Sequence, residues 1–248
     1  MTRVLSATVL AALVLGVVCF LPPEATLLLA VLASAVAFAE YADLAAAFGS
    51  KVPTSPACAA VAAACVAVAG DEPPLALVCL VALLCVGVLA VVRGQPGPDV
   101  LRDASASLFP LLYIGVPLGT LAAIRAIGGR DATLLLMATI VVSDSAQYYT
   151  GRAFGRHQLA PAISPKKTVE GAIGGLIFGT AAMTFGGLEV FKGVNIWLLV
   201  ATAIAVVVLG MLGDLFESLL KRSAGVKDSS TLIPGHGGVL DRIDSWLF

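Results

Sequence analysis

The sequence predicts an all-α protein, a polytopic bundle of about eight transmembrane helices. Hydrophobic residues make up 59% of the 248 residues and charged residues only 12%, whereas a soluble domain carries about 25% charged residues. The mean hydropathy is +0.99. The apolar residues also gather in runs close to the roughly 20 residues that a helix needs to cross a bilayer. The chain is therefore expected to be an integral membrane protein.

Eight apolar runs are the candidate spans. Their ranges are 4–21, 26–47, 55–70, 74–92, 105–124, 131–150, 171–189 and 195–213. Proline, glycine and aspartate mark most of the breaks between them. Arg3 precedes the first run, but no small-x-small cleavage site follows, so we expect a retained helix rather than a signal peptide. The five cysteines lie in the apolar runs and are interpreted as packing residues.

The basic residues predict the orientation. With a cytoplasmic N-terminus and eight spans, 12 of the 15 basic residues face the cytoplasm, as the positive-inside rule requires. Only Arg125, Arg130 and Lys192 then face outward. All the polar motifs described below fall on the cytoplasmic side. The net charge of −1 gives no reason to expect a nucleic-acid partner.

Polar residues continue directly from the last apolar run. Asp214, Glu217, Ser218 and Lys221 have the spacing i, i+3, i+4 and i+7, which places them on one helical face. Acids at membrane depth are costly and usually mark function. We therefore interpret Asp214 as a metal ligand. Glu217 and Lys221 could equally form an ordinary ion pair.

A glycine-rich turn and an acidic cluster follow in the tail. The turn is Pro234-Gly235-His236-Gly237-Gly238, and the cluster is Asp241-Arg242-Ile243-Asp244. Glycines allow a close approach of backbone to a ligand, and successive N–H groups can hold an anion. Two carboxylates beside a cation suit a divalent ion that holds phosphate oxygens. Taken alone, the glycines could form only a turn, and His236 could be a hydrogen-bonded loop residue.

Asp144 lies about six residues inside the expected end of the sixth span, so a metal or a basic residue should meet it. A buried ion pair that holds two helices together is the structural alternative.

Before the seventh span, Ser164 is expected to be an N-cap and Pro165 the first helical residue. Lys166 and Lys167 would then lie in the first turn and bind an anionic phosphate. Alternatively, the two lysines reflect only the positive-inside rule.

Three glycines after these lysines, Gly171, Gly175 and Gly179, are spaced for close helix packing. Glu40 and Asp43 lie one turn apart in the second span. They could line a polar cavity or face a neighbouring helix, and we leave them out of the catalytic set.

The tail resembles the motif of the phosphatidate cytidylyltransferases, also called CDP-diacylglycerol synthases. The matching positions are Ser218, Lys221-Arg222, Lys227-Asp228, Pro234, His236-Gly237-Gly238 and Asp241-Arg242-Ile243-Asp244. The Ser143-Asp144 pair and the segment from Ser164 to Gly171 also look like family motifs. The resemblance covers about residues 140–248. We accordingly expect N-terminal transmembrane helices over 1–130 and a catalytic transmembrane region over 131–248.

The resemblance implies an enzyme that makes CDP-diacylglycerol and pyrophosphate from CTP and phosphatidic acid with Mg²⁺. A second cation is an open alternative. The resemblance also implies that Asp214 and Asp241 bind the metal, and Asp144 is expected as a third acid. With Lys221 these acids form the expected catalytic set. The residues expected at the substrate phosphates are Lys166, Lys167, Arg222, Lys227, His236, Gly237, Gly238 and Arg242.

The resemblance also implies a homodimer among membrane lipids, and we expect it in the plasma membrane with a cytoplasmic site. Family members usually continue into a further helix after the acidic cluster. The sequence ends at Phe248, where that helix would begin, so we expect either a missing helix or eight spans. Several alternatives remain. The chain could transfer the group to another lipid phosphate or be a CTP-dependent lipid kinase. It could also be an ion-coupled transporter using Glu40, Asp43 and Asp144, or an inactive scaffold.

Overall fold

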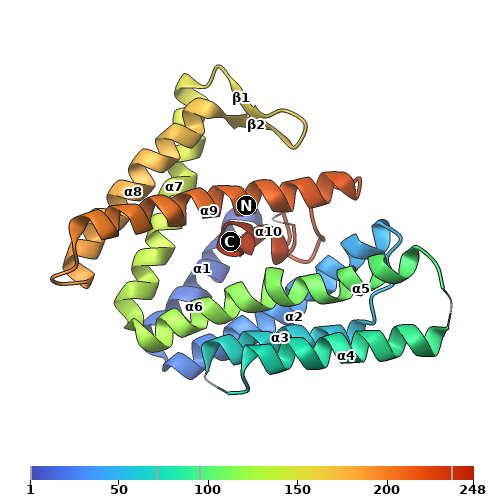
Figure 1. Ribbon diagram of the computed structural model, residues 1–248. Coiled ribbons are helices and arrows are strands. Elements are labelled where there is room, and N and C mark those ends of the chain that lie inside the picture. Colours follow the sequence, from blue (N-terminus) through green and yellow to red (C-terminus); the bar gives the residue numbers. More distant parts are fainter. Residues whose placement is uncertain (1, 71, 95, 236) are drawn as a thin grey trace. The chain divides into compact units, whose positions relative to one another are not determined.

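The computed structural model describes residues 2–70, 72–94, 96–235 and 237–248, and helices dominate this part of the chain (Figure 1). The chain divides into two compact units. The first contains the residues up to Ile127 together with Ser223–Ile243 and Leu247. The second contains Gly128–Arg222, Asp244–Trp246 and Phe248.

The first unit is built from helices that follow one another along the first half of the chain. They are α1 (Thr2–Phe20), α2 (Pro23–Ala47), α3 (Thr54–Ala69), α4 (Leu75–Arg93), α5 (Asp99–Pro110), the π-helical segment η1 (Leu111–Gly115) and α6 (Val116–Ile127). The short helix α10 (Leu240–Ile243) in the tail belongs to the same unit.

Close packing of η1 and α6 against α3 forms the core of this unit. A side chain at Gly115 would collide with the carbonyl of Val61, and one at Gly119 with the carbonyl of Cys65. Small residues let helices approach in this way inside a membrane, where the hydrophobic effect does not drive helices together. Val61 and Cys65 are completely buried as a result.

The second unit combines three long helices with a small hairpin. Its elements are α7 (Gly129–Phe154), β1 (Gln158–Ala160), β2 (Ser164–Thr168), α8 (Val169–Val190), α9 (Ile196–Ser223), whose last residue belongs to the first unit, and the 3-10 turn η2 (Asp244–Trp246). The strands β1 and β2 pair antiparallel. In Figure 1, α7 and α8 run side by side with the hairpin at one end of the pair.

The predicted glycine face of α8 packs against α7, as expected. A side chain at Gly171 or Gly175 would collide with Gln147, and one at Gly179 with Ser143. The two helices can therefore place polar residues of α7 close to the beginning of α8.

Each of the eight predicted ranges contains helix in the described residues, but eight membrane spans are not confirmed. Five helical segments are long and apolar enough to cross a membrane: Pro23–Ala47, Leu75–Arg93, Asp99–Ile127, Val169–Val190 and Ile196–Ser223. Two other apolar helices, Ser6–Phe20 and Thr54–Ala69, are shorter. The remaining long helix of the described residues, α7, carries more polar and charged residues, among them Asp144 and Arg152.

The predicted start of the helix at Ser164 is wrong. Residues Ser164–Thr168 form strand β2, and α8 begins at Val169 with Thr168 as its N-cap. The Thr168 hydroxyl accepts a hydrogen bond from the Gly171 amide at 3.1 Å. A residue that precedes proline favours extended backbone, which suits Ser164. The strand also keeps the two lysines out of a first helical turn, where their charges would oppose the helix dipole.

Candidate functional site

A buried carboxylate in the first unit organises the tail. Glu40 lies on α2 and is only 4% exposed. Its Oε1 accepts hydrogen bonds from the Ser230 hydroxyl at 2.7 Å and the Val239 amide at 2.9 Å. Its Oε2 accepts from the Ser229 hydroxyl at 2.9 Å and the Leu240 amide at 2.8 Å. Glu40 thus binds both ends of the loop that contains the glycine-rich turn.

Asp241 accepts hydrogen bonds from the same loop. It is 5% exposed, and its Oδ2 accepts from the Ser229 amide at 2.9 Å, the Ser229 hydroxyl at 2.8 Å and the Gly238 amide at 2.7 Å. The Ser229 hydroxyl therefore lies between the carboxylates of Glu40 and Asp241.

The glycines of the turn allow this close approach. Gly237 has a φ of 77°, a conformation that favours glycine, and a side chain there would collide with Asp241. At Gly238 a side chain would collide with the Glu40 carboxylate and the Ser229 hydroxyl. The sequence predicts that backbone N–H groups of this turn hold an anion, and in the structure the Gly238 amide binds a carboxylate of the protein itself.

The second unit holds a separate charged cluster. Lys167 on β2 forms an ion pair with Asp214 on α9, with 2.5 Å between Nζ and Oδ2. The Ser218 hydroxyl, one turn along α9, donates to Asp214 Oδ1 at 3.5 Å. Both charged side chains are mostly buried, at 20% and 26% exposure. The pair fixes the end of the hairpin against α9.

Asp144 on α7 belongs to the same cluster. Gln147 donates to its Oδ1 at 3.0 Å, and the Ser245 hydroxyl donates to its Oδ2 at 3.4 Å. Its carboxylate lies within electrostatic range of Asp214, which repels it, and of Lys167, which attracts it. The expectation that a basic residue lies near Asp144 is confirmed. One lysine thus offsets the charge of two acids.

The polar residues that are predicted to share one helical face all lie on α9. Glu217 and Lys221 form a buried ion pair one turn apart, which is the structural alternative that their spacing allowed. Lys221 is therefore held by an acid of its own helix.

The other predicted phosphate-binding residues are spread over both units. Lys166 is exposed on β2, and Lys227 and Arg242 are exposed in the tail of the first unit. Arg222 donates from Nε to the carbonyl of Ile163 in the hairpin at 3.4 Å. His236 lies outside the described residues. Of the predicted metal acids, Asp144 and Asp214 belong to the second unit and Asp241 to the first.

The donor atoms of the second unit fit an oxygen-preferring ion. Asp144 and Asp214 offer carboxylate oxygens, and Ser218 and Ser245 add hydroxyl oxygens nearby. Mg²⁺ prefers such ligands and usually keeps several waters, so it needs only one or two carboxylates from a protein. Within the described part of the chain, no three His, Cys, Asp or Glu residues gather into a metal-binding group.

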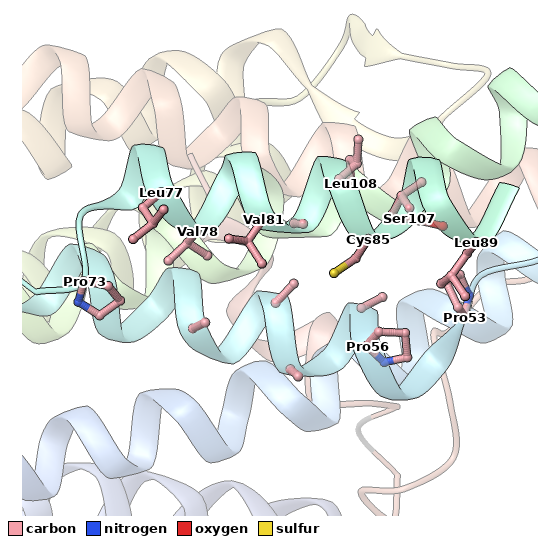
Figure 2. A pocket seen from close by; sticks show the side chains of 16 residues that line it. Pro53, Pro56, Pro73, Leu77, Val78, Val81, Cys85, Leu89, Ser107 and Leu108 are labelled. Atoms are coloured by element: carbon pink, nitrogen blue, oxygen red, sulfur yellow. The ribbon is translucent and has the colours of Figure 1, made fainter. Parts of the chain in front are cut away.

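A pocket in the first unit has different chemistry. It has a volume of about 420 Å³ and lies between α3, α4 and α5 (Figure 2). Apolar side chains such as Leu77, Val81 and Leu89 line it, and Ser107 contributes a hydroxyl. None of the predicted site residues is among its lining residues. The lining is almost entirely apolar, so it offers few polar groups that could bind a phosphate.

Glu40, like Asp43, is not in the catalytic set predicted from the sequence. Its role could not be inferred from spacing because its partners lie 189 to 200 positions away in the chain. One signal was present, since an acid inside an apolar span is rarely without a function.

Comparison with known proteins identifies relatives of the chain. Residues 1–248 match the family described as the cytidylyltransferase family. A phosphatidate cytidylyltransferase of Staphylococcus haemolyticus is 42% identical over 146 residues, which cover 59% of this chain and 56% of the relative. The phosphatidate cytidylyltransferase of Haemophilus influenzae is 50% identical over 118 residues, covering 45% of this chain and 41% of the relative. The chain thus spans about half the length of the curated relatives it matches.

Proposed function

Because this chain belongs to the cytidylyltransferase family, we propose that it transfers the cytidylyl group of CTP to phosphatidic acid and forms CDP-diacylglycerol and pyrophosphate. The proposal is supported by relatives named phosphatidate cytidylyltransferase. The structural observation that carries it is the cluster of Lys167, Asp144 and Asp214, which joins three elements at motif positions. Such a group of acids and a cation suits phosphate chemistry.

The reaction needs no strong general base. An oxygen of the lipid phosphate attacks the α-phosphorus of CTP, a new P–O–P bond forms, and the bond between the α-phosphorus and the bridging oxygen breaks. Pyrophosphate leaves with that oxygen and the electron pair. The second pKa of a phosphate monoester is near 6, so the nucleophile is already anionic at neutral pH. Catalysis then rests on positioning and on neutralising charge.

In this mechanism the acids would hold Mg²⁺. Asp214 and Asp144 supply oxygens in the second unit, and Asp241 is the third proposed ligand. The ion would polarise phosphate oxygens and offset the charge of the leaving pyrophosphate. A second cation remains part of the proposal.

The cations would bind substrate phosphates. The ion pair between Lys167 and Asp214 supports a contact of this lysine with a phosphate brought to that carboxylate. The other proposed phosphate-binding residues are Lys166, Lys221, Arg222, Lys227, Arg242 and the turn His236-Gly237-Gly238.

We further propose that the N-terminus and the site face the cytoplasm, in the plasma membrane, and that the enzyme is a homodimer. The distribution of basic residues supports this orientation, and CTP is found on that side. The lipid arrives from the bilayer and CTP from the water, so the site must be open to both.

The test is an assay with purified protein in lipid–detergent micelles, radiolabelled CTP and phosphatidic acid. Wild-type protein should form a labelled lipid in the presence of Mg²⁺, and Asp214→Asn should lose this activity by about 100-fold or more. Glu189→Gln, at an exposed acid on α8, is the matched control and should keep the wild-type rate. Absence of labelled lipid from folded wild-type protein would reject the proposal.

Competition between phosphatidic acid and other lipid phosphates separates the proposed reaction from transfer to a related acceptor. An ion-coupled transporter is less consistent with the geometry, because all four hydrogen bonds described for Glu40 tie its carboxylate to the tail.

A further inference from the structure

We infer that Glu40 is a positioning residue for the proposed reaction, and that it sets the conformation of the segment that carries Asp241. The inference rests on the proposed function only where it concerns turnover. Its structural part concerns the first unit alone, to which Glu40 and all its described partners belong. Asp241, not Glu40, is the residue proposed to act at the metal.

The hydrogen bonds of Glu40 are distributed symmetrically. Each carboxylate oxygen lies within hydrogen-bond distance of one hydroxyl and one backbone amide: Oε1 of those of Ser230 and Val239, and Oε2 of those of Ser229 and Leu240. The four donors come from two segments separated by the glycine-rich turn. One side chain therefore fixes both ends of the turn at once.

This arrangement requires a carboxylate. A carboxylate has two acceptor oxygens, whereas the amide of glutamine has one acceptor and one donor group. In a Glu40→Gln variant the NH₂ group would face one serine hydroxyl, which can rotate and accept, and one backbone amide, which can only donate. That amide would then lose its partner in a buried environment, which is more costly than the loss of an exposed hydrogen bond.

The bonds of Glu40 lead directly to Asp241. The Ser229 hydroxyl lies 2.9 Å from Glu40 Oε2 and 2.8 Å from Asp241 Oδ2, so the two carboxylates share its single hydrogen. The amides of Ser229 and Gly238 also bind Asp241. Leu240, bound to Glu40 through its amide, directly precedes Asp241 in the chain. Any shift of these donors must move the Asp241 carboxylate.

Asp43 provides a matched comparison. It lies one turn further along α2 and is an acid like Glu40, but its side chain is exposed. If acids on this helix were needed only for charge or solubility, the two residues would be equivalent. The structure distinguishes them because only Glu40 is described with hydrogen bonds to the tail.

The kinetic test compares Glu40→Gln with Asp43→Asn in the labelled-CTP assay. We expect Glu40→Gln to lower kcat per folded molecule roughly 10- to 100-fold, as for a misplaced group at a reacting centre. The Mg²⁺ concentration for half-maximal rate should rise roughly tenfold, with little change in KM for CTP. Asp43→Asn should match wild type. A Glu40→Gln variant with lower thermal stability but wild-type kcat and Mg²⁺ dependence would show a structural role only and overturn the inference.

Hydrogen exchange gives a second readout that does not need activity. Amides of peptides covering residues 229–241 should exchange faster in Glu40→Gln than in wild type or Asp43→Asn. Unchanged exchange would overturn the inference even if wild type is active. If wild type makes no labelled lipid, the proposed function fails, and the exchange experiment still decides whether Glu40 holds the segment. Should Glu40→Gln not fold, Ser229→Ala tests the same connection and should show the same loss of kcat and protection.

Discussion

The ammonium group of Lys167 lies 2.5 Å from Oδ2 of Asp214, and this ion pair joins strand β2 to helix α9. Lys166, the preceding residue, is exposed. Successive side chains of a strand point to opposite faces, so the hairpin directs one lysine toward α9 and the other away from it. Two adjacent lysines that look equivalent in the sequence therefore have different environments.

The first prediction concerns these two lysines. Lys167→Ala should lower the rate of CDP-diacylglycerol formation by about 100-fold, because it removes the cation beside Asp214. Lys166→Ala should cause a smaller loss. The assay is the one with labelled CTP. The control is Lys192→Ala, at an exposed lysine outside the hairpin and the tail. Equal losses at the two hairpin lysines would contradict the assignment.

A double-mutant cycle tests the ion pair itself. Thermal unfolding of Lys167→Ala, Asp214→Asn and the double variant should give a coupling free energy of about 0.5–3 kcal/mol. The coupling arises because each single change leaves a mostly buried charge without its partner. Additive effects of the two changes would show that the pair does not contribute to stability.

The second prediction concerns Gly238. A methyl group there would collide with the Glu40 carboxylate and the Ser229 hydroxyl, so Gly238→Ala should destabilise the protein by about 1–3 kcal/mol and lower activity. Gly97→Ala is the matched control, because nothing lies within 4 Å of the added carbon. Thermal unfolding of both variants in the same detergent is the measurement. The prediction fails if the two variants unfold at the same temperature.

The third prediction concerns the link between the hairpin and α8. Glu170 Oε2 accepts hydrogen bonds from the amides of Arg156 and His157 at 3.0 and 3.3 Å, and Oε1 lies 2.6 Å from His157 Nδ1. Glu170→Ala should free this connection, so trypsin should cleave after Arg156 several times faster. Glu189→Gln on the same helix is the control. Identical cleavage rates would show that other contacts hold the segment.

The fourth prediction concerns metal removal. Chelation of divalent ions should abolish turnover, and Mg²⁺ should restore it better than Ca²⁺, because Mg²⁺ is bound through few carboxylates together with substrate phosphates. Circular dichroism should show unchanged helix content, because the close helix packing described above is made by the protein's own groups. Full activity in excess chelator would reject the proposed metal role.

The sequence was informative where local spacing determines the structure. Four polar residues of α9, among them Asp214 and Lys221, lie on the helix that their spacing predicts, and Gly171, Gly175 and Gly179 form the predicted packing face. Both patterns depend only on the 3.6-residue period of the α-helix.

The sequence misled where two local signals competed. Ser164 and Pro165 fit a helix start, yet the pairing of β2 with β1 keeps them extended and moves the N-cap to Thr168. The partners of Glu40 could not be predicted either. They depend on a tertiary contact between α2 and the tail, which no periodicity within α2 specifies.

The separation of Glu40 from its partners also constrains the order of folding during synthesis. Its amide donors Val239 and Leu240 follow it by 199 and 200 residues. At roughly 5–20 residues per second, the ribosome takes roughly 10–40 s to make them. Throughout that time the carboxylate must stay hydrated, because burying it without donors is costly. The Gly128–Arg222 segment of the second unit emerges before these donors, so α7 and α8 can pack against each other before the tail binds Glu40.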